Sequence, residues 1–159
     1  MHHDKGSEEN IFDHVDRQLG EKTSIPTNLQ YTRSWFQTPN TYDTQYNYIA
    51  SGQTTGTTDE RSKIEILDIA RTDTRLIDDK TIFAFGPYVH REGYNYYASK
   101  NLLNDFGPIQ GQAVAQQLSL LTAGAHSDIS WVQGHNSFKL GGVYSQTFLR
   151  ENPQFGLGD

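Results

Sequence analysis

The strictest pattern in the sequence is an alternation of apolar and polar residues near its C-terminal end. In LLTAGAHSDISWVQG, apolar side chains recur at every second position, interrupted only by Ser127, and SFKLGGVYSQTFL repeats the period after a short polar sequence. Successive side chains of a β-strand point to opposite faces, so a period of two predicts two strands with one apolar face. That face would carry Leu121, Ala123, Ala125, Ile129 and Trp131, then Phe138, Leu140, Gly142, Tyr144 and Phe148.

Extended segments bounded by turn residues recur along the rest of the chain. Their connections alternate between short polar turns (GEKTS, IDDK, QGHN) and long stretches, 38–62 and 98–117, rich in Asn, Thr, Gly, Gln and Ser. Tight turns at one end and long outer loops at the other are typical of an up-and-down antiparallel sheet. We therefore predict an all-β fold, an antiparallel up-and-down meander of about six long strands after a disordered N-terminus over residues 1–9. The expected strands are 11–18, 28–37, 64–76, 81–97, 118–132 and 137–150.

Strand length bears on whether the sheet is soluble or crosses a membrane. The longest runs, of about 13 to 17 residues, exceed the usual 5 to 6 of globular proteins and suffice for a tilted crossing of about 9 to 11 residues. No export signal opens the chain, and no stretch approaches the roughly 18 apolar residues of a membrane helix, so a membrane role would have to use strands. A soluble β-sandwich shows the same alternation, so the period alone leaves both open.

Composition removes several classes of function. The net charge of −6 and the pI near 5.4 give no basic stripe of the kind that neutralises phosphates, so nucleic acid is not an expected partner. The chain has no cysteine, which excludes a disulfide framework and thiol chemistry. Aromatic residues make up 12% of a chain that is only 35% hydrophobic, so their positions carry information.

The densest aromatic segment is KTIFAFGPYVHREGYNYY, residues 80–97. With Lys80 at a tight turn, a crossing of about ten residues ends near His90 or Arg91, and the tyrosines beyond would lie at the outer headgroup level. Pro87 within this strand favours a bulge or an edge position. The alternative is that these aromatics are core residues of a soluble β-protein. The candidate membrane-interface aromatics are Trp35, Phe36, Tyr94, Tyr96, Tyr97, Trp131 and Phe148, and the candidate lipid-facing residues are Leu121, Ala123, Ala125, Ile129, Phe138 and Leu140.

Four segments resemble successive pieces of the barrel of TonB-dependent receptors: TNLQYTRSWFQTPNTYD, KTIFAFGPYVHREGYNYYASKNLLNDFGPIQ, LLTAGAHSDISWVQGHNSFKLGG and YSQTFLRENPQFGLGD. The likeness runs, with gaps, from about Asn10 to the C-terminus. It points to the large acidobacterial type, which often carries a carboxypeptidase-regulatory-like domain. The resemblance implies an outer-membrane β-barrel whose parent imports a scarce nutrient of the siderophore, cobalamin or glycan class, with energy passed on by TonB.

The departures from that family define what we expect of this chain. Such receptors have a plug domain, an energy-coupling box and about 22 strands, whereas residues 10–159 supply about six strands and neither of the others. Six strands cannot close a barrel, whose known minimum is about eight. Where the family usually has proline and an aromatic, this chain has Arg71 and Asp73, so charge lies near the middle of one strand. We expect a partial barrel in the outer membrane, with lipid, the remaining barrel and the plug as partners, and TonB as a partner of the parent only.

Candidate chemical sites are few. His126 and Asp128 share one strand face, as do His14 and Asp16, and such pairs could bind a metal or act as acid and base. Without a third ligand at compatible spacing, they are more often solvated polar residues. The sequence therefore predicts no enzyme, no catalytic or metal site and no cofactor. In the first long loop, Tyr42, Tyr46 and Tyr48 could contact a ligand. The alternative function is a soluble antiparallel β-sheet ligand-binding module.

Overall fold

The computed structural model of the chain describes residues 5–37, 61–97 and 112–157. These residues form seven β-strands that hydrogen-bond into one antiparallel sheet. The expected all-β antiparallel meander is thereby confirmed, with seven strands in place of about six. The strands are β1 (Gly6–Leu19), β2 (Thr23–Gln37), β3 (Arg61–Arg71), β4 (Asp73–Asp78), β5 (Thr81–Tyr97), β6 (Gln112–Gln133) and β7 (Asn136–Leu157).

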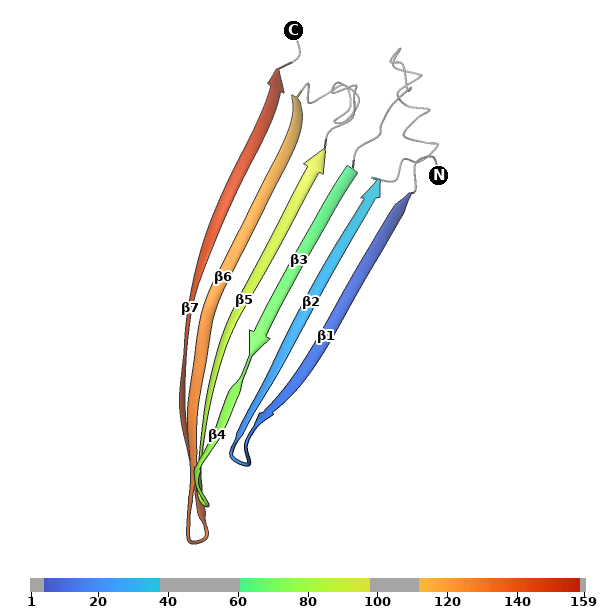
Figure 1. The fold of residues 1–159 in the computed structure, drawn as a ribbon. Coiled ribbons are helices and arrows are strands. Elements are labelled where there is room, and N and C mark those ends of the chain that lie inside the picture. The colour runs from blue at the N-terminus through green and yellow to red at the C-terminus, as the bar shows by residue number, and fades with distance from the viewer. Residues whose placement is uncertain (1–4, 38–60, 98–111, 158–159) are drawn as a thin grey trace.

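The strands follow one another across the sheet in the order β1-β2-β3-β5-β6-β7, and β4 continues the course of β3 between β2 and β5. Figure 1 shows the three tight turns at one end of the sheet and the strand ends that flank the two long connections at the other. The short turns expected at GEKTS, IDDK and QGHN are confirmed at residues 20–22, 79–80 and 134–135. The long connections lie largely outside the described residues.

The expected strand 64–76 is interrupted at Thr72, and two prolines account for the interruption. The Thr72 N–H donates to the Pro26 carbonyl at 3.0 Å, but Pro26 has no N–H with which to return the second bond of that pair. The pairs before and after this point place Arg71 across from Pro87 of β5. Pro87 also lacks an N–H, so the ladder between these two strands loses a bond there as well. The expected bulge or edge position of Pro87 is wrong, since β5 is an interior strand that pairs in continuous register with β6.

Most strands extend beyond their expected bounds. Strand β1 begins at Gly6, so residues 6–9, expected to be disordered, pair with β2 instead. Strand β6 begins at Gln112 and takes up the end of the expected loop 98–117, while β7 continues to Leu157. The added residues lack strict alternation and owe their strand structure to pairing with a neighbour. Only the expected strand 81–97 matches its observed bounds.

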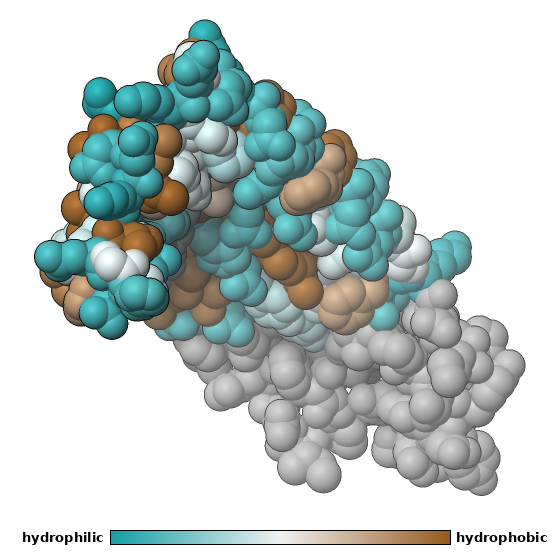
Figure 2. All heavy atoms as spheres, turned by 90° about the horizontal axis from the view of Figure 1, so that it is seen from below, coloured by the Kyte–Doolittle hydropathy of each residue, from teal (hydrophilic) through white to brown (hydrophobic). Residues whose placement is uncertain are grey.

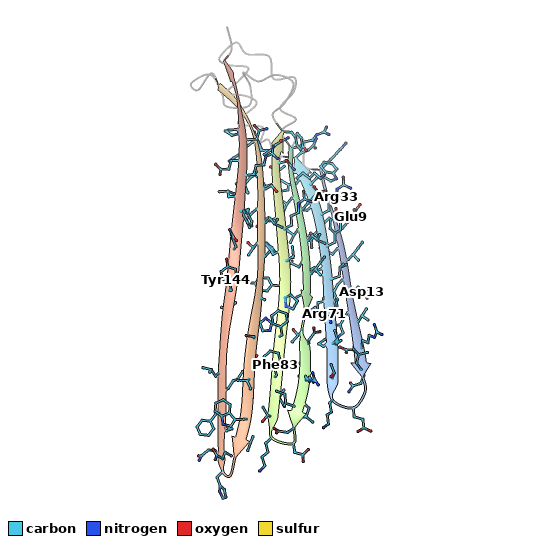
Figure 3. All side chains as sticks on the ribbon, turned by 60° about the vertical axis from the view of Figure 1, so that its left-hand side comes forward. Glu9, Asp13, Arg33, Arg71, Phe83 and Tyr144 are labelled. Carbon is cyan, nitrogen blue, oxygen red and sulfur yellow. The ribbon has the colours of Figure 1, made fainter. Side chains whose placement is uncertain are left out.

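The described strands form a single layer, and the residues described enclose no core. Among the described residues no large side chain is fully buried, and many large hydrophobic side chains are exposed. Figure 3 shows side chains projecting from both faces of one layer of strands, and Figure 2 shows hydrophobic residues at the surface beside hydrophilic ones. A sheet normally buries at least one face against another layer. What covers this sheet is therefore the central functional question.

The hairpin turns are staggered along the strand direction. Thr23, the first residue of β2, pairs with Arg75, and β4 continues beyond this pair before it turns. Thr81, the first residue of β5, pairs with Trp131, and β6 again continues beyond the pair. Each turn thus lies farther along than the one before, as Figure 1 shows from β1 to β7. If all three turns are to lie in one plane, the strands must be inclined away from the normal of that plane.

Two of the tight turns contain a glycine with a positive φ, 67° at Gly20 and 63° at Gly134. A Cβ is unfavourable in this left-handed region by about 1–2 kcal/mol. We expect Gly134→Ala to lower the free energy of unfolding by about that amount, measured by urea titration of the folded sheet. The matched control is Gly142→Ala within β7, where φ is not positive and an added Cβ meets nothing within 4 Å. If both substitutions lower the free energy of unfolding equally, the positive φ of Gly134 is not the cause of the loss.

The turn between β4 and β5 contains an acid-sensitive carboxylate. The Lys80 N–H donates to Asp78 Oδ1 at 2.8 Å, and this bond, with a smaller contribution from Thr81, holds the pKa of Asp78 below its ordinary value. A depressed folded pKa stabilises the sheet at pH values above the unfolded pKa, and this stabilisation is lost as pH falls through the folded pKa. The stability difference between the native chain and Asp78→Asn should therefore be full at pH 6 and shrink towards pH 3. Asp79→Asn is the charge-matched control, and a difference that does not change with pH would contradict the expectation.

Candidate functional site: the two faces of the sheet

Pairing is in register across the sheet apart from a shift between Leu76 and Asp78 at the end of β4, so the strand residues outside this shift can be assigned to one of two faces. We define face A by the cross-strand row Ile11, Tyr31, Leu67, Arg91, Leu121 and Phe148, and face B by the adjacent row Phe12, Gln30, Asp68, His90, Thr122 and Thr147. Residues directly opposite in an antiparallel pair point to the same side. The two faces differ in chemistry, and we take them as the candidate functional surfaces.

Face A carries an uncharged, largely apolar surface over β5, β6 and β7, which we call the apolar band. All six residues expected to face lipid lie within it, so the structure brings them together on one face. The polar side chains within this surface, such as those of Ser127 and Gln146, are uncharged, and Gly142 adds no side chain. The band consists of Phe83, Phe85, Pro87 and Val89 on β5, the alternate residues from Leu121 to Trp131 on β6, and those from Phe138 to Phe148 on β7.

The length of the apolar band can be compared with a membrane. Phe138 and Phe148 lie about 34 Å apart along β7 at the usual rise of about 3.4 Å per residue. At a strand tilt of about 40°, this distance projects to about 26 Å. The apolar band of outer-membrane barrels is about 25 Å tall. The Trp131 and Phe138 rings stack at the turn end of the band, with centroids 5.2 Å apart.

Face A is less uniform over β1 to β4, where charged residues interrupt it. Arg71 and Asp73, adjacent on this face, form a two-point ion pair, with Nε 2.7 Å from Oδ1 and Nη2 3.0 Å from Oδ2. The two opposite charges thus compensate each other. Figure 3 labels six side chains of face A: Glu9, Asp13, Arg33, Arg71, Phe83 and Tyr144.

The candidate interface aromatics do not share one face. Trp35, Tyr97, Trp131 and Phe148 lie on face A, whereas Phe36, Tyr94 and Tyr96 lie on face B. The Tyr94 hydroxyl lies 3.3 Å from that of Ser62, a buried residue of β3 on face B. On face A, Trp35 and Tyr97 lie near the long connections and Trp131 near a tight turn, so these residues cannot form one girdle at a single level. The loop tyrosines Tyr42, Tyr46 and Tyr48 lie outside the described residues.

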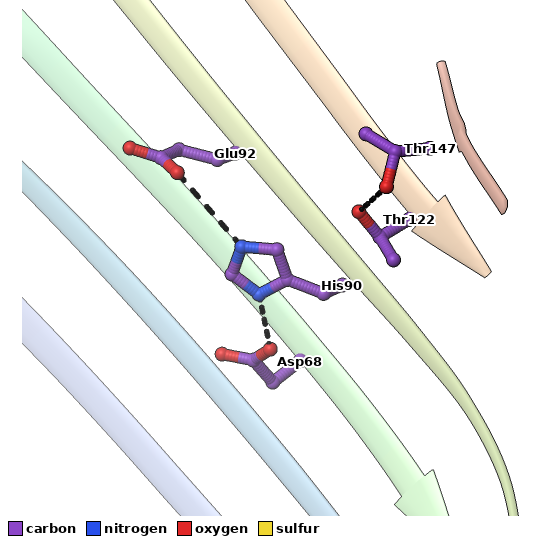
Figure 4. A network of polar contacts seen from close by, with 5 residues as sticks. All are labelled: Asp68, His90, Glu92, Thr122 and Thr147. Carbon is purple, nitrogen blue, oxygen red and sulfur yellow. Dashed lines mark hydrogen bonds and ion pairs between the residues drawn. The ribbon is translucent and has the colours of Figure 1, made fainter. Parts of the chain in front are cut away.

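Face B carries a network of polar contacts between neighbouring strands. His90 of β5 donates through Nδ1 to Asp68 Oδ1 of β3 at 2.5 Å, and its Nε2 lies 3.9 Å from Glu92 Oε2 (Figure 4). In the same row, the hydroxyls of Thr122 and Thr147 are 2.9 Å apart, which links β6 to β7. These contacts pair charged and polar groups without enclosing them, as at a surface that faces water.

The two histidine–aspartate pairs singled out in the sequence, His14 with Asp16 and His126 with Asp128, also lie on face B. His14 Nδ1 donates to Asn28 Oδ1 at 2.5 Å, and its Nε2 lies 3.1 Å from Asp16. Asp128 pairs with Lys139 at 3.1 Å rather than with His126. Among the described residues, no three His, Cys, Asp or Glu side chains cluster in a way that could hold a metal ion. Face B therefore presents polar residues that are paired with one another across neighbouring strands.

Glycines on face B let large side chains lie flat on the sheet. The His126 ring covers Gly86 on the neighbouring strand, and a Cβ at Gly86 would overlap the ring. The Tyr88 ring covers Gly124, where a Cβ would lie 2.7 Å from the ring. Glycine in a strand interior weakens the strand unless a neighbour uses the space, and here each space is used by an aromatic side chain from the opposite strand.

The apolar residues change face at one level of the sheet, which sequence reasoning missed. Between the tight turns and the row that defines face A, most large apolar residues of β5 to β7 lie on face A, with Ile82, Val132 and Val143 as exceptions on face B. One row farther towards the long connections, face A carries Glu65, Gly93, Ser119 and Arg150. Face B at that level carries Ile66, Leu120 and Leu149, together with Glu92 of β5. The signal in the sequence is three apolar doublets, Ile66-Leu67, Leu120-Leu121 and Phe148-Leu149, which only the pairing places in line.

No helix long and apolar enough to cross a membrane occurs among the described residues. No model of a known protein family matches the chain, and a search of curated proteins likewise finds no match.

A double-mutant cycle tests the packing of His126 over Gly86. Gly86→Ala should lower the free energy of unfolding by about 1–3 kcal/mol, because the new methyl group displaces the ring. In a His126→Ala background the same substitution should cost little, since the space is then empty. Urea unfolding followed by circular dichroism measures both. If Gly86→Ala lowers the free energy of unfolding equally in both backgrounds, the loss comes from the backbone at position 86 and not from contact with the His126 ring.

Proposed function

We propose that this chain forms part of the wall of an outer-membrane transport barrel of the TonB-dependent receptor kind, with the apolar band of face A against lipid and face B towards the lumen. The parent receptor takes up a scarce nutrient of the siderophore, cobalamin or glycan class. The partners of this segment are outer-membrane lipid, the remaining strands of the barrel and the plug. TonB is a partner of the parent only.

The observation that carries the proposal is the apolar band on a sheet without a second layer. Exposed apolar surfaces of this extent must be covered by an apolar phase or by another protein surface. The band agrees in height with the hydrocarbon layer, is free of charge over three neighbouring strands, and lies opposite a polar face. Alternating lipid-facing and lumen-facing residues are the pattern of outer-membrane barrels.

The overall arrangement supports the same proposal. Tight turns gather at one end, and their stagger is the one that tilted barrel strands require. The ordered resemblance of four sequence segments to TonB-dependent receptor barrels supports it independently of the geometry. The charged residues of face A on β1 to β4 count against the proposal, because charge is unfavourable against lipid. Arg71 and Asp73 count against it least, because they neutralise each other in an ion pair.

The open edges of the sheet follow from the same proposal. Among the described residues, β1 pairs only with β2 and β7 only with β6. Lipid cannot hydrogen-bond the free N–H and C=O groups of an edge strand, so open edges do not occur in the hydrocarbon layer. Further strands must therefore flank β1 and β7, as the remainder of a barrel would.

Two adjacent residues of β7 provide the test. Tyr144 lies on face A in the middle of the band, Val143 lies on face B, and they are equally exposed, at 71% and 72%. An arginine at the lipid midplane costs about 2–4 kcal/mol, whereas a lumen position tolerates it. We expect Tyr144→Arg to reduce the fraction that folds in detergent micelles and Val143→Arg to leave it nearly unchanged. Circular dichroism and heat-modifiable gel migration after refolding from urea measure the folded fraction.

The same refolding without detergent is the control. The proposal requires β-structure that appears only with the amphiphile. Cooperative β-structure in plain buffer would contradict it and favour a soluble β-sheet ligand-binding module. Equal losses for Tyr144→Arg and Val143→Arg would contradict the assignment of lipid to face A.

A further inference from the structure

A hollow of about 350 Å³ lies on the sheet surface just beyond the apolar band, at the end of the long connections. Apart from Leu118, its lining residues all belong to face A. Its floor is formed where Gly93 of β5 and Ser119 of β6 lie opposite each other, so one floor position has no side chain and the other has only a hydroxymethyl group. The hollow therefore owes its depth to two small residues side by side.

Two arginines border this hollow from different strands. Arg91 of β5 and Arg150 of β7 lie two strand spacings apart across the sheet, roughly 10 Å, and two residues apart along it, roughly 7 Å. The backbone positions are thus roughly 12 Å apart, a gap that two long side chains can close around a small anion. Among the described residues, neither has a carboxylate partner within the 4 Å of an ion pair. Their guanidinium groups therefore keep their hydrogen-bonding capacity for a ligand.

One carboxylate, Glu65, also lines the hollow, and its charge is already compensated. Lys63 Nζ lies 2.8 Å and Arg33 Nε 4.0 Å from Glu65 Oε1, and the Tyr31 hydroxyl donates to the same oxygen at 3.4 Å. The remaining lining groups are neutral: Asn95, Gln117 and Asn152 supply side-chain amides, which can donate to an anion. The surface around the hollow thus favours negative charge.

The position of the hollow indicates the source of that charge. It begins at Arg91, in the row of Leu67, Leu121 and Phe148, and extends towards the long connections from there. A molecule bound in the hollow therefore has the apolar band of the protein next to it on one side, the side towards the tight turns. An amphiphile with an anionic head and acyl chains fits this sequence of surfaces, whereas a free anion uses only the hollow.

We propose that the hollow binds the phosphate group of a membrane amphiphile between Arg91 and Arg150, with the acyl chains lying on the apolar band. This inference rests on the proposed function, because it takes face A as the side in contact with lipid. Guanidinium groups bind phosphate oxygens through pairs of parallel hydrogen bonds, and the Ser119 hydroxyl and the amides complete a polar lining. The site thereby fixes the level of the sheet at the outer headgroups.

The test titrates dodecyl phosphate into the full chain refolded in neutral maltoside micelles, with dodecanol and inorganic phosphate as comparison probes. Calorimetry should show binding of dodecyl phosphate well above that of either comparison. Each of Arg91→Gln and Arg150→Gln should weaken it about fivefold, and the double variant about 25-fold. The charge-matched control is Lys22→Gln with Lys80→Gln, both at the turn end, which should leave the affinity unchanged.

A second variant tests the shape of the hollow without changing any charge. A Cβ at Gly93 meets only the Glu65 carbonyl oxygen, at 3.9 Å, so a side chain can be placed there, and Gly93→Val should fill the floor and abolish the preference for dodecyl phosphate. Gly142→Val, on face A within the band and with nothing within 4 Å, is the matched control and should retain it.

Three results would overturn the inference. Equal binding of dodecyl phosphate by the native chain and the double arginine variant would show that the hollow is not the site. Binding of inorganic phosphate as tightly as dodecyl phosphate would exclude the amphiphile as the source. In both cases the proposed function would stand, because the chain would still fold in micelles. Absence of β-structure in micelles would overturn the proposed function and this inference together.

Discussion

The hydrogen-bonded register between neighbouring strands is the constraint on which the rest of this structure depends. Side chains alternate with a period of two, so a slip of one residue in any pair would transfer a whole strand's side chains to the other face. The register instead aligns the uncharged face A residues of β5, β6 and β7 into one band. It also sets His90 against Asp68 and Thr122 against Thr147 on the opposite face.

A sheet of one layer cannot obtain its stability from an enclosed core. Among the described residues no large side chain is fully buried, so the strands are held by backbone hydrogen bonds and by contacts along each face. Covering the apolar band is then worth about 25 cal/mol per Å² of apolar surface. Lipid would supply that covering in the proposed role, and flanking strands would satisfy the edges of β1 and β7, which lipid cannot.

Much of the fold could be predicted because its signals are local. Alternation from Leu121 to Phe148 predicted a hairpin with one apolar face, and turn residues predicted all three tight turns. The division at Thr72 was not predicted, because it depends on prolines in two other strands, Pro26 and Pro87. The seven candidate interface aromatics were chosen from their distance along the chain, yet their face depends on residue parity within each strand, which separates Tyr94 and Tyr96 from Tyr97.

The amino-acid order by itself determined the class of structure, since a period of two, turn residues at tight connections and the lack of cysteine are properties of each segment alone. It also determined which residues of one hairpin share a face. Only the tertiary structure decided which strands lie side by side and at what level. Arg91, Gly93, Ser119 and Arg150 meet around one hollow because strands from distant parts of the chain pair in one register, and no local pattern carries that information.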